Sequence, residues 1–414
     1  MGHTRTEADQ ALQTLLMDAH AAPPHELARL IDRCAIELGA RNAIAYLADL
    51  QQHVLVPFVD ADGPGTDAQL TPLNVDSTLA GRAYQTFDLQ SQDAGAEGVR
   101  LWLPLLVGAD RLGVLGVTVA DASLLEADDA RLRSDLARLA TQVAALLVSK
   151  SPYGDTLVRL RRGSEMGLAA EIQWSLLPPL TFSSRPVTVA AALEPCYHVA
   201  GDTIDYAVDA GRTHIAIFDG MGHGLQSALC AVLAVAAYRN ARRSARTLTE
   251  TMLTVDEALL KGLGGEVFTT AMLGQLDTAT GMLEWVNAGH PEPLLLRDGR
   301  LIRHLHIDPR PPLGFGNMQG ANELIVGSEQ LEPGDRVLLY TDGVVEARSP
   351  AGEFFGVDRL ADLVIRHLAG GLSAPETMRR VVRELLDHQQ DQLSDDASLL
   401  LLEWRSDDEP VLIT

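Results

Sequence analysis

The spacing of apolar residues predicts alternating helices and strands along the first third of the chain. Leu27, Leu30, Ile31 and Cys34 recur at helical intervals and predict a helix over residues 25–39. Cys34 lies on this apolar face, so we expect it to pack in a core. The same reasoning predicts helices over 6–21, 77–86 and 127–148, and strands over 43–50, 53–59, 101–107 and 112–120.

The second half of the chain carries longer apolar strands. They are predicted over 187–194, 204–210, 213–219, 268–277, 282–288, 293–297, 335–340 and 397–404. Helices are predicted over 223–241, 248–263, 356–368 and 374–388. This mixture predicts an α/β protein with two folded blocks.

A helical connector is predicted between the two blocks. Leu157, Leu160, Leu168, Ile172 and Leu176 form one apolar stripe, which ends at two prolines. A coiled coil and packing onto the next domain both remain open, and we favour packing slightly. With 414 residues, two or three domains are expected. We divide the chain into a first domain (1–150), a helical linker (151–182), a second domain (183–405) and a tail (406–414).

Composition and charge exclude several classes of function. Lys and Arg number 33 against 56 Asp and Glu, so the formal net charge is −23. Such a chain repels phosphate backbones and anionic membranes, which argues against nucleic-acid and membrane partners. Cys34, Cys196 and Cys230 form no CxxC pair, so neither a disulfide framework nor a zinc site is expected. Reduced thiols and the absence of an apolar leader favour a cytoplasmic location.

Acidic residues lie at the ends of several predicted strands, next to glycines. Asp202 opens one strand, Asp219 ends another, and Asp342 and the Asp395-Asp396 pair flank two more. Each alone is an ordinary turn feature. Together they can converge, and oxygen-only ligands of this kind suit hard cations such as Mg²⁺ or Mn²⁺.

Five motifs in the second block resemble a known family. They are Val199-Ala200-Gly201-Asp202, Asp219-Gly220-Met221-Gly222-His223-Gly224, Asn287-Ala288-Gly289-His290-Pro291, Tyr340-Thr341-Asp342-Gly343 and Asp395-Asp396-Ala397-Ser398. Together they are similar to the bacterial metal-dependent protein phosphatases of the PPM (PP2C-like) superfamily, SpoIIE/RsbU type. Residues 171–178 resemble the switch helix that leads into that catalytic domain.

The resemblance implies an α-β-β-α sandwich with two Mn²⁺ or Mg²⁺ ions between its sheets. Carried over by position, Asp219 would bridge the ions, with the Gly220 carbonyl on one of them. Asp342 and Asp395 would hold the other ion, and Asp202 would act through metal-bound waters. His223 is the candidate acid for the leaving serine oxygen, because its ordinary pKa is near neutral.

Other family positions are expected to shape the fold. Asn287 and His290 are expected to support the site without ligating metal, and Gly289 and Gly314 to serve tight turns. The chain departs from the usual pattern at Ala200, Thr203-Ile204, Gly220-Met221 and Trp174, which puts substrate preference and regulation in doubt but removes no metal carboxylate.

The first block resembles a GAF-type sensor domain in its order of elements. Leu101-Trp102-Leu103-Pro104-Leu105 before Arg111–Val117 is similar to the penultimate hairpin of that family. A sensor for a small molecule or protein signal is one interpretation. A generic α/β domain used only for dimerisation is equally open.

These resemblances imply a signal-responsive serine/threonine phosphatase. The expected substrate is a phosphorylated STAS-type anti-sigma-factor antagonist in a partner-switching pathway, and a homodimer is expected. The alternative is a phosphatase fold used as a signalling scaffold without catalysis, although every metal carboxylate position is filled. A histidine-kinase-like enzyme has little support, because the chain lacks a glycine-rich nucleotide loop with a suitable lysine.

Overall fold

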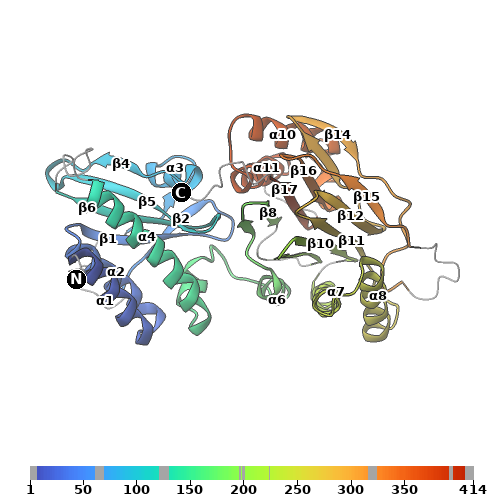
Figure 1. Ribbon diagram of the computed structural model, residues 1–414, viewed down its shortest axis with the longest axis horizontal. Coiled ribbons are helices and arrows are strands. Elements are labelled where there is room, and N and C mark those ends of the chain that lie inside the picture. The colour runs from blue at the N-terminus through green and yellow to red at the C-terminus, as the bar shows by residue number, and fades with distance from the viewer. Residues whose placement is uncertain are drawn as a thin grey trace. The chain divides into compact units, whose positions relative to one another are not determined.

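A computed structural model divides the chain into two compact units, Met1–Ser164 and Glu165–Ile413. The structure describes residues 7–60, 70–120, 130–194, 197, 201–222, 224–315, 324–390 and 395–405. Each unit has its own sheets and apolar cores, and each is described here by itself (Figure 1).

The first unit is built on one antiparallel sheet of six strands in the order β3-β2-β1-β6-β5-β4. Its strands are β1 (Arg41–Ala48), β2 (Val54–Phe58), β3 (Leu73–Asn74), β4 (Gln90–Asp93), β5 (Val99–Val107) and β6 (Asp110–Val119). Its helices are α1 (Glu7–Ala21), α2 (Leu27–Glu37), α3 (Leu79–Thr86), α4 (Ala130–Lys150) and α5 (Thr156–Leu160).

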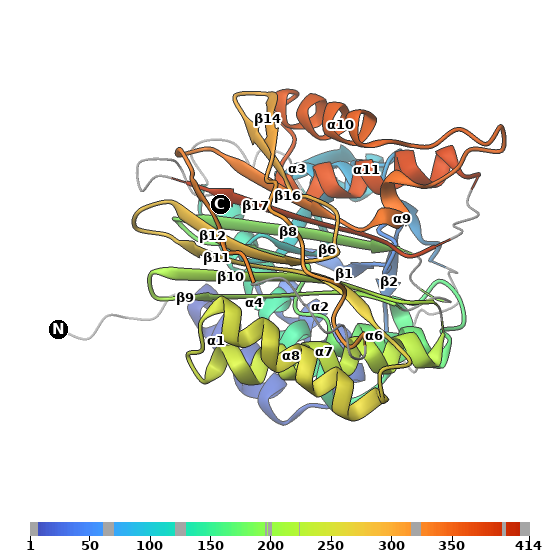
Figure 2. The same ribbon diagram turned by 90° about the vertical axis from the view of Figure 1, so that its right-hand side faces the viewer.

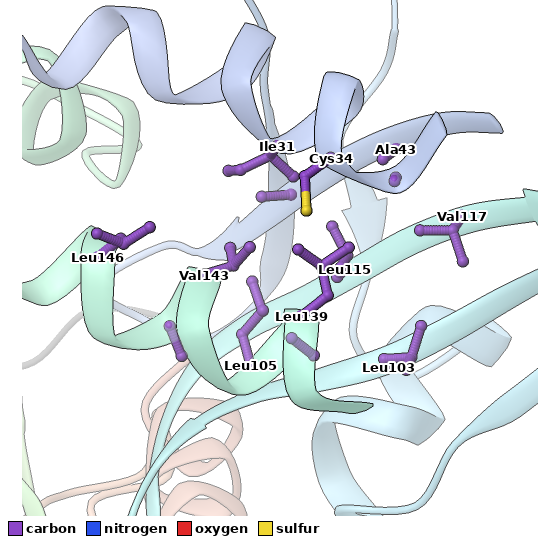
Figure 3. Close-up of a cluster of buried hydrophobic side chains, with 14 of the residues drawn as sticks. Ile31, Cys34, Ala43, Leu103, Leu105, Leu115, Val117, Leu139, Val143 and Leu146 are labelled. Atoms are coloured by element: carbon purple, nitrogen blue, oxygen red, sulfur yellow. The ribbon is translucent and has the colours of Figure 1, made fainter. Parts of the chain in front are cut away.

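Helices cover both faces of this sheet, and the core explains the apolar pattern. On one face, side chains of α1, α2 and α4 pack onto β1, β5 and β6. Figure 3 shows the Cys34 sulfur among Leu115, Leu139 and Val143 in this cluster, which confirms the prediction of a core cysteine. On the other face, Tyr84 of α3 packs in a second cluster with Trp102. Strand β6 is buried on both faces, and it is therefore apolar along most of its length.

The second unit contains two antiparallel sheets. One has the order β15-β12-β11-β10-β9, and the other has the order β14-β13-β16-β17-β8-β7. The strands are β7 (Thr181–Ser183), β8 (Val187–Glu194), β9 (Asp202–Asp209), β10 (Arg212–Gly220), β11 (Thr269–Asp277), β12 (Met282–Ala288), β13 (Leu294–Arg297), β14 (Arg300–His304), β15 (Gly327–Gln330), β16 (Arg336–Tyr340) and β17 (Ala397–Trp404).

The two sheets and their helices form an α-β-β-α sandwich (Figure 2). The helices are α6 (Leu168–Leu176), α7 (Leu225–Arg243), α8 (Leu248–Leu263), α9 (Asp342–Val345), α10 (Val357–Ala369) and α11 (Ala374–His388). One cluster fills the space between the sheets, one joins α7 and α8 to the first sheet, and one joins α10 and α11 to the second. The predicted sandwich is therefore confirmed. No helix among the described residues is long and apolar enough to cross a bilayer.

The single connecting helix predicted over 157–176 is wrong. The structure has two helices there, α5 in the first unit and α6 in the second, with non-helical residues between them. Arg161 explains the break, because its side chain donates to the carbonyl of Ala48 and its own carbonyl accepts the N–H of Leu50. These bonds hold the end of α5 against β1, where a continuing helix could not make them.

Several short elements were not predicted. Strands β3, β4, β7, β14 and β15 have two to five residues each, and the short helix α9 begins at Asp342. Short strands at sheet edges carry little apolar periodicity, so their formation depends on the strand beside them.

Candidate metal centre

Asp202 and Asp219 face each other across two neighbouring strands of the first sheet. Asp202 is the first residue of β9, and Asp219 is its direct partner on β10. Opposed residues of an antiparallel pair hold their Cβ atoms about 5 Å apart. Apolar residues on the inner face of these strands pack between the sheets, and this packing sets the register that places both carboxylates at one end of the ladder.

The second sheet brings Asp342 and Asp395 to the same place. Asp342 follows β16 as the first residue of α9, and Asp395 precedes β17, the neighbour of β16. A Cβ on Gly343 would lie 1.8 Å from the carbonyl oxygen of Asp396 and 3.5 Å from the Cβ of Asp395. Only glycine therefore lets the turn after Asp342 lie against residues 395–396.

Electrostatic repulsion shows that the four carboxylates form one cluster. Burial, together with the charges of Asp342, Asp395 and Asp396, raises the pKa of Asp219 to about 7. Burial, with the charges of Asp219 and Asp396, raises the pKa of Asp202 well above its usual range. Burial and Asp395 raise the pKa of Asp342. No positive group of the described residues is among the charges that shift these three pKa values.

A cluster of carboxylates in which Asp202 is buried, Asp219 is half-buried and Asp342 and Asp395 are exposed fits cations that bind at the surface end of the two sheets. The donors are all oxygen, the ligand type that Mg²⁺ and Mn²⁺ prefer. The carbonyl of Gly220, next to Asp219, accepts a hydrogen bond from Ser227 Oγ at 3.1 Å and keeps a second lone pair. Within the described residues, no three ligating side chains are close enough to bind one ion together.

Thr341 supports this cluster and was missed by the sequence reasoning. Its hydroxyl donates to Asp202 Oδ2 at 2.7 Å and accepts the N–H of Ser398 at 2.9 Å. Because the Ser398 amide can only donate, the hydroxyl proton is directed at Asp202. Thr341 lies immediately before Asp342 in the motif Tyr340–Gly343, and this adjacency was the sequence signal for its role.

Asp396 also contacts the site, through hydrogen bonds to the backbone beside Asp202. Its Oδ2 accepts the backbone N–H groups of Gly201 at 2.5 Å and of Asp202 at 3.3 Å. The side chain of Asp396 is buried, whereas Asp395 is exposed. Two adjacent acidic residues thus have different surroundings, which the apolar pattern of the sequence does not reveal.

Helix α6 contacts the strand that begins at Asp202. The buried Gln173 donates from Nε2 to the carbonyl of Asp202 at 2.5 Å. Arg239 of α7 bridges the carbonyl of Leu176 and the carboxylate of Asp205. The end of α6 is therefore joined to β9 beside the carboxylate cluster.

Of the two histidine candidates, only His290 lies among the described residues. His223 lies outside the described residues. His290 is buried, its Nδ1 is 2.8 Å from Thr270 Oγ1, and its backbone bonds with the Asn287 side chain. Burial lowers the pKa of His290 to about 3, so the ring is neutral. Gly289 and Gly314 have φ values of +70° and +81°, as expected for tight turns.

Comparison with known proteins places these residues in context. Residues 209–405 match the family model of stage II sporulation protein E (SpoIIE). RsbU of Bacillus subtilis, named a phosphoserine phosphatase, is 24% identical over 240 residues, which cover 58% of this chain and 70% of RsbU. Protein IcfG of Synechocystis is 32% identical over 122 residues, 30% of this chain and 18% of IcfG.

A solved structure resembles the same part of the chain. The SiaA-PP2C domain of Pseudomonas aeruginosa is 24% identical, with a TM-score of 0.47, and the match covers 57% of this chain and 94% of that one. The chain thus spans less than a fifth of IcfG and most of RsbU. Residues 209–405, which hold Asp219, Asp342 and Asp395, form a domain of the SpoIIE family.

Proposed function

We propose that this protein is a metal-dependent serine/threonine protein phosphatase. The observation that carries the proposal is the cluster of Asp202, Asp219, Asp342 and Asp395, which two sheets bring together and in which no positive group of the described residues contributes to the pKa shifts of Asp202, Asp219 and Asp342. The SpoIIE-family match and the phosphoserine phosphatase activity named for RsbU support it.

Each residue has a proposed role in a two-ion site of Mn²⁺ or Mg²⁺. Asp219 would contact both ions, the Gly220 carbonyl one of them, and Asp342 and Asp395 the other. When bound, such ions activate a water and neutralise phosphoryl oxygens during in-line attack. Asp202, whose carboxylate accepts a hydrogen bond from Thr341, would act through metal-bound water. His223 is the proposed donor of a proton to the leaving serine oxygen.

The proposed substrate is a phosphorylated STAS-domain protein, an anti-sigma-factor antagonist in a partner-switching pathway. RsbU, the relative matched over 58% of this chain, supports a phosphoserine substrate by its name. We therefore expect this chain to release phosphate from a phosphoserine on a small folded protein.

A direct test measures hydrolysis of p-nitrophenyl phosphate and of a phosphorylated STAS protein by the full chain, with and without Mn²⁺. Asp219→Asn removes the charge of the bridging carboxylate, and we expect turnover to fall at least about a hundredfold. Asp209→Asn, at the exposed far end of β9, is the matched control and should retain full activity. Folded wild-type protein without Mn²⁺-dependent turnover on either substrate would contradict the proposal and favour a non-catalytic scaffold.

We further propose that the first unit is a GAF-like sensor and that α6 passes its state to the site. The central sheet of that unit, with helices on both faces, supports a sensor of this kind. The bond from Gln173 to the Asp202 carbonyl supports the coupling. Deleting residues 1–150 should change basal turnover or its response to signals, and unchanged behaviour in both would contradict this regulation.

We also propose a cytoplasmic homodimer. Cys34 and Cys230 are free and buried, as expected for reduced thiols. Light scattering on the full chain tests the dimer, and a monomeric mass at micromolar concentration would contradict it.

A further inference from the structure

We propose that Asp396 positions the Asp202 side of the metal centre by accepting backbone hydrogen bonds and does not itself ligate metal. This inference rests on the proposed function for its meaning in catalysis. It concerns the second residue of the Asp395-Asp396 pair. Asp395 is exposed and accepts the N–H of Asp396, whereas Asp396 is buried and accepts the N–H of Gly201.

The bonds of Asp396 join the two sheets of the sandwich. Asp396 lies just before β17 of the second sheet, and the amides of Gly201 and Asp202 lie where β9 of the first sheet begins. Both N–H groups donate to the same oxygen, Oδ2. Buried amides without an acceptor are costly, so Oδ2 of Asp396 is committed to the backbone at Gly201 and Asp202, the Gly201 turn.

The Gly201 turn lies directly against the Gly220 carbonyl. The N–H of Gly220 donates to the carbonyl of Gly201 at 3.0 Å. A Cβ on Gly201 would lie 2.9 Å from the Gly220 oxygen and 2.6 Å from Ser227 Oγ. A shift of the Gly201 turn would therefore move Asp202 and the carbonyl beside Asp219 together.

Asp395 has the surroundings of a ligand instead. Its side chain is exposed, and its charge raises the pKa of both Asp219 and Asp342. Its Oδ1 accepts the N–H of Asp396 at 2.9 Å. Asp395 can thus give an oxygen to an ion, while Asp396 gives its oxygen to the backbone.

The same substitution at the two adjacent positions separates these roles. Asparagine keeps an acceptor oxygen and removes the charge, so Asp396→Asn should preserve the turn whereas Asp395→Asn should lose a charged ligand. Asp396→Ala removes the acceptor as well. Asp335→Asn serves as a structural control, because Asp335 is a buried carboxylate next to the opposite end of β16.

The first readout is Mn²⁺ affinity of the full chain, measured by titration calorimetry. We expect Asp395→Asn to weaken binding at least about a hundredfold, Asp396→Asn by less than about tenfold, and Asp396→Ala by more than Asp396→Asn. Asp335→Asn should lower thermal stability without changing Mn²⁺ affinity. Turnover at saturating Mn²⁺ should fall in Asp396→Ala and recover in Asp396→Asn.

The second readout is thermal unfolding without metal, which does not depend on catalysis. Asp396→Ala should lower the unfolding midpoint by about 5 °C, because two buried amides lose their acceptor, and Asp395→Asn should not lower it. A midpoint and an Mn²⁺ affinity of Asp396→Ala equal to wild type would overturn the inference. So would Asp396→Asn losing Mn²⁺ while Asp395→Asn keeps it, since Asp396 would then be the ligand. If wild type binds no Mn²⁺, the proposed function fails and the midpoints alone decide whether Asp396 holds the turn.

Discussion

The hydroxyl of Thr341 lies 2.7 Å from Oδ2 of Asp202 and joins the two sheets of the sandwich at the carboxylate cluster. Thr341 follows β16 of the second sheet, whereas Asp202 opens β9 of the first. The oxygen of the same hydroxyl accepts a hydrogen bond from the Ser398 amide. The orientation of Asp202 is thus determined by a residue 139 positions away in sequence.

Replacing Thr341 tests this relationship. Thr341→Val keeps the shape and removes the hydroxyl, so turnover should fall roughly tenfold and the free energy of unfolding by about 2 kcal/mol, since two buried partners lose their bonds. Thr341→Ser keeps the hydroxyl and should retain most of both. Equal turnover in the valine and serine variants would show that the bond to Asp202 has no catalytic role.

Gly343→Ala tests the close approach of the two acidic turns. The new Cβ would meet the Asp396 carbonyl oxygen at 1.8 Å, and backbone atoms would have to move. We expect a loss of about 3 kcal/mol in the free energy of unfolding, measured by urea denaturation, and weaker Mn²⁺ binding. Gly167→Ala, whose Cβ would have an ordinary 3.4 Å contact, is the control and should change little.

Gln173→Ala tests the contact between α6 and the site. The variant removes the bond to the Asp202 carbonyl, and we expect turnover to fall about tenfold with only about 1 kcal/mol lost in stability. Ser175→Ala lies on the same helix and removes only an exposed bond to the Ile172 carbonyl. It should retain wild-type turnover, and a comparable loss in both variants would point to general damage to α6.

His290 predicts a pH dependence of stability. Its pKa is about 3 in the folded protein and about 6.5 when unfolded, so protons bind the unfolded chain preferentially as pH falls below 6.5. The stabilisation is complete above that pH and declines by about 2 kcal/mol between pH 8 and pH 5. The difference in unfolding free energy between wild type and His290→Gln should decrease by this amount, and a difference independent of pH would contradict the buried neutral ring.

Much of the fold followed from the order of residues because apolar periodicity is local. The long strands and the amphipathic helices were predicted, as was the burial of Cys34. The carboxylates were found because each lies at the end of an apolar strand, and Asp202, Asp219 and Asp342 also lie next to a glycine. Their proposed roles as ligands remain predictions.

The stripe from Leu157 to Leu176 shows where local periodicity fails. Its apolar residues have helical spacing, yet Arg161 bonds to the backbone of residues 48 and 50, and the helix ends there. The competing partners lie about a hundred residues earlier in the chain, so no local pattern contains them. Short edge strands were missed for the same reason.

The sequence by itself determined the chemistry that the site can perform: oxygen donors at strand ends, glycines that permit close turns, and an excess of negative charge. Only the tertiary structure decided which residue each of these oxygen donors contacts. In the folded chain Asp396 accepts the amide of Gly201, Asp395 is exposed, and the hydroxyl of Thr341 donates to Asp202. These contacts form between strands that are distant in sequence, and the packing of the two sheets sets which residues meet.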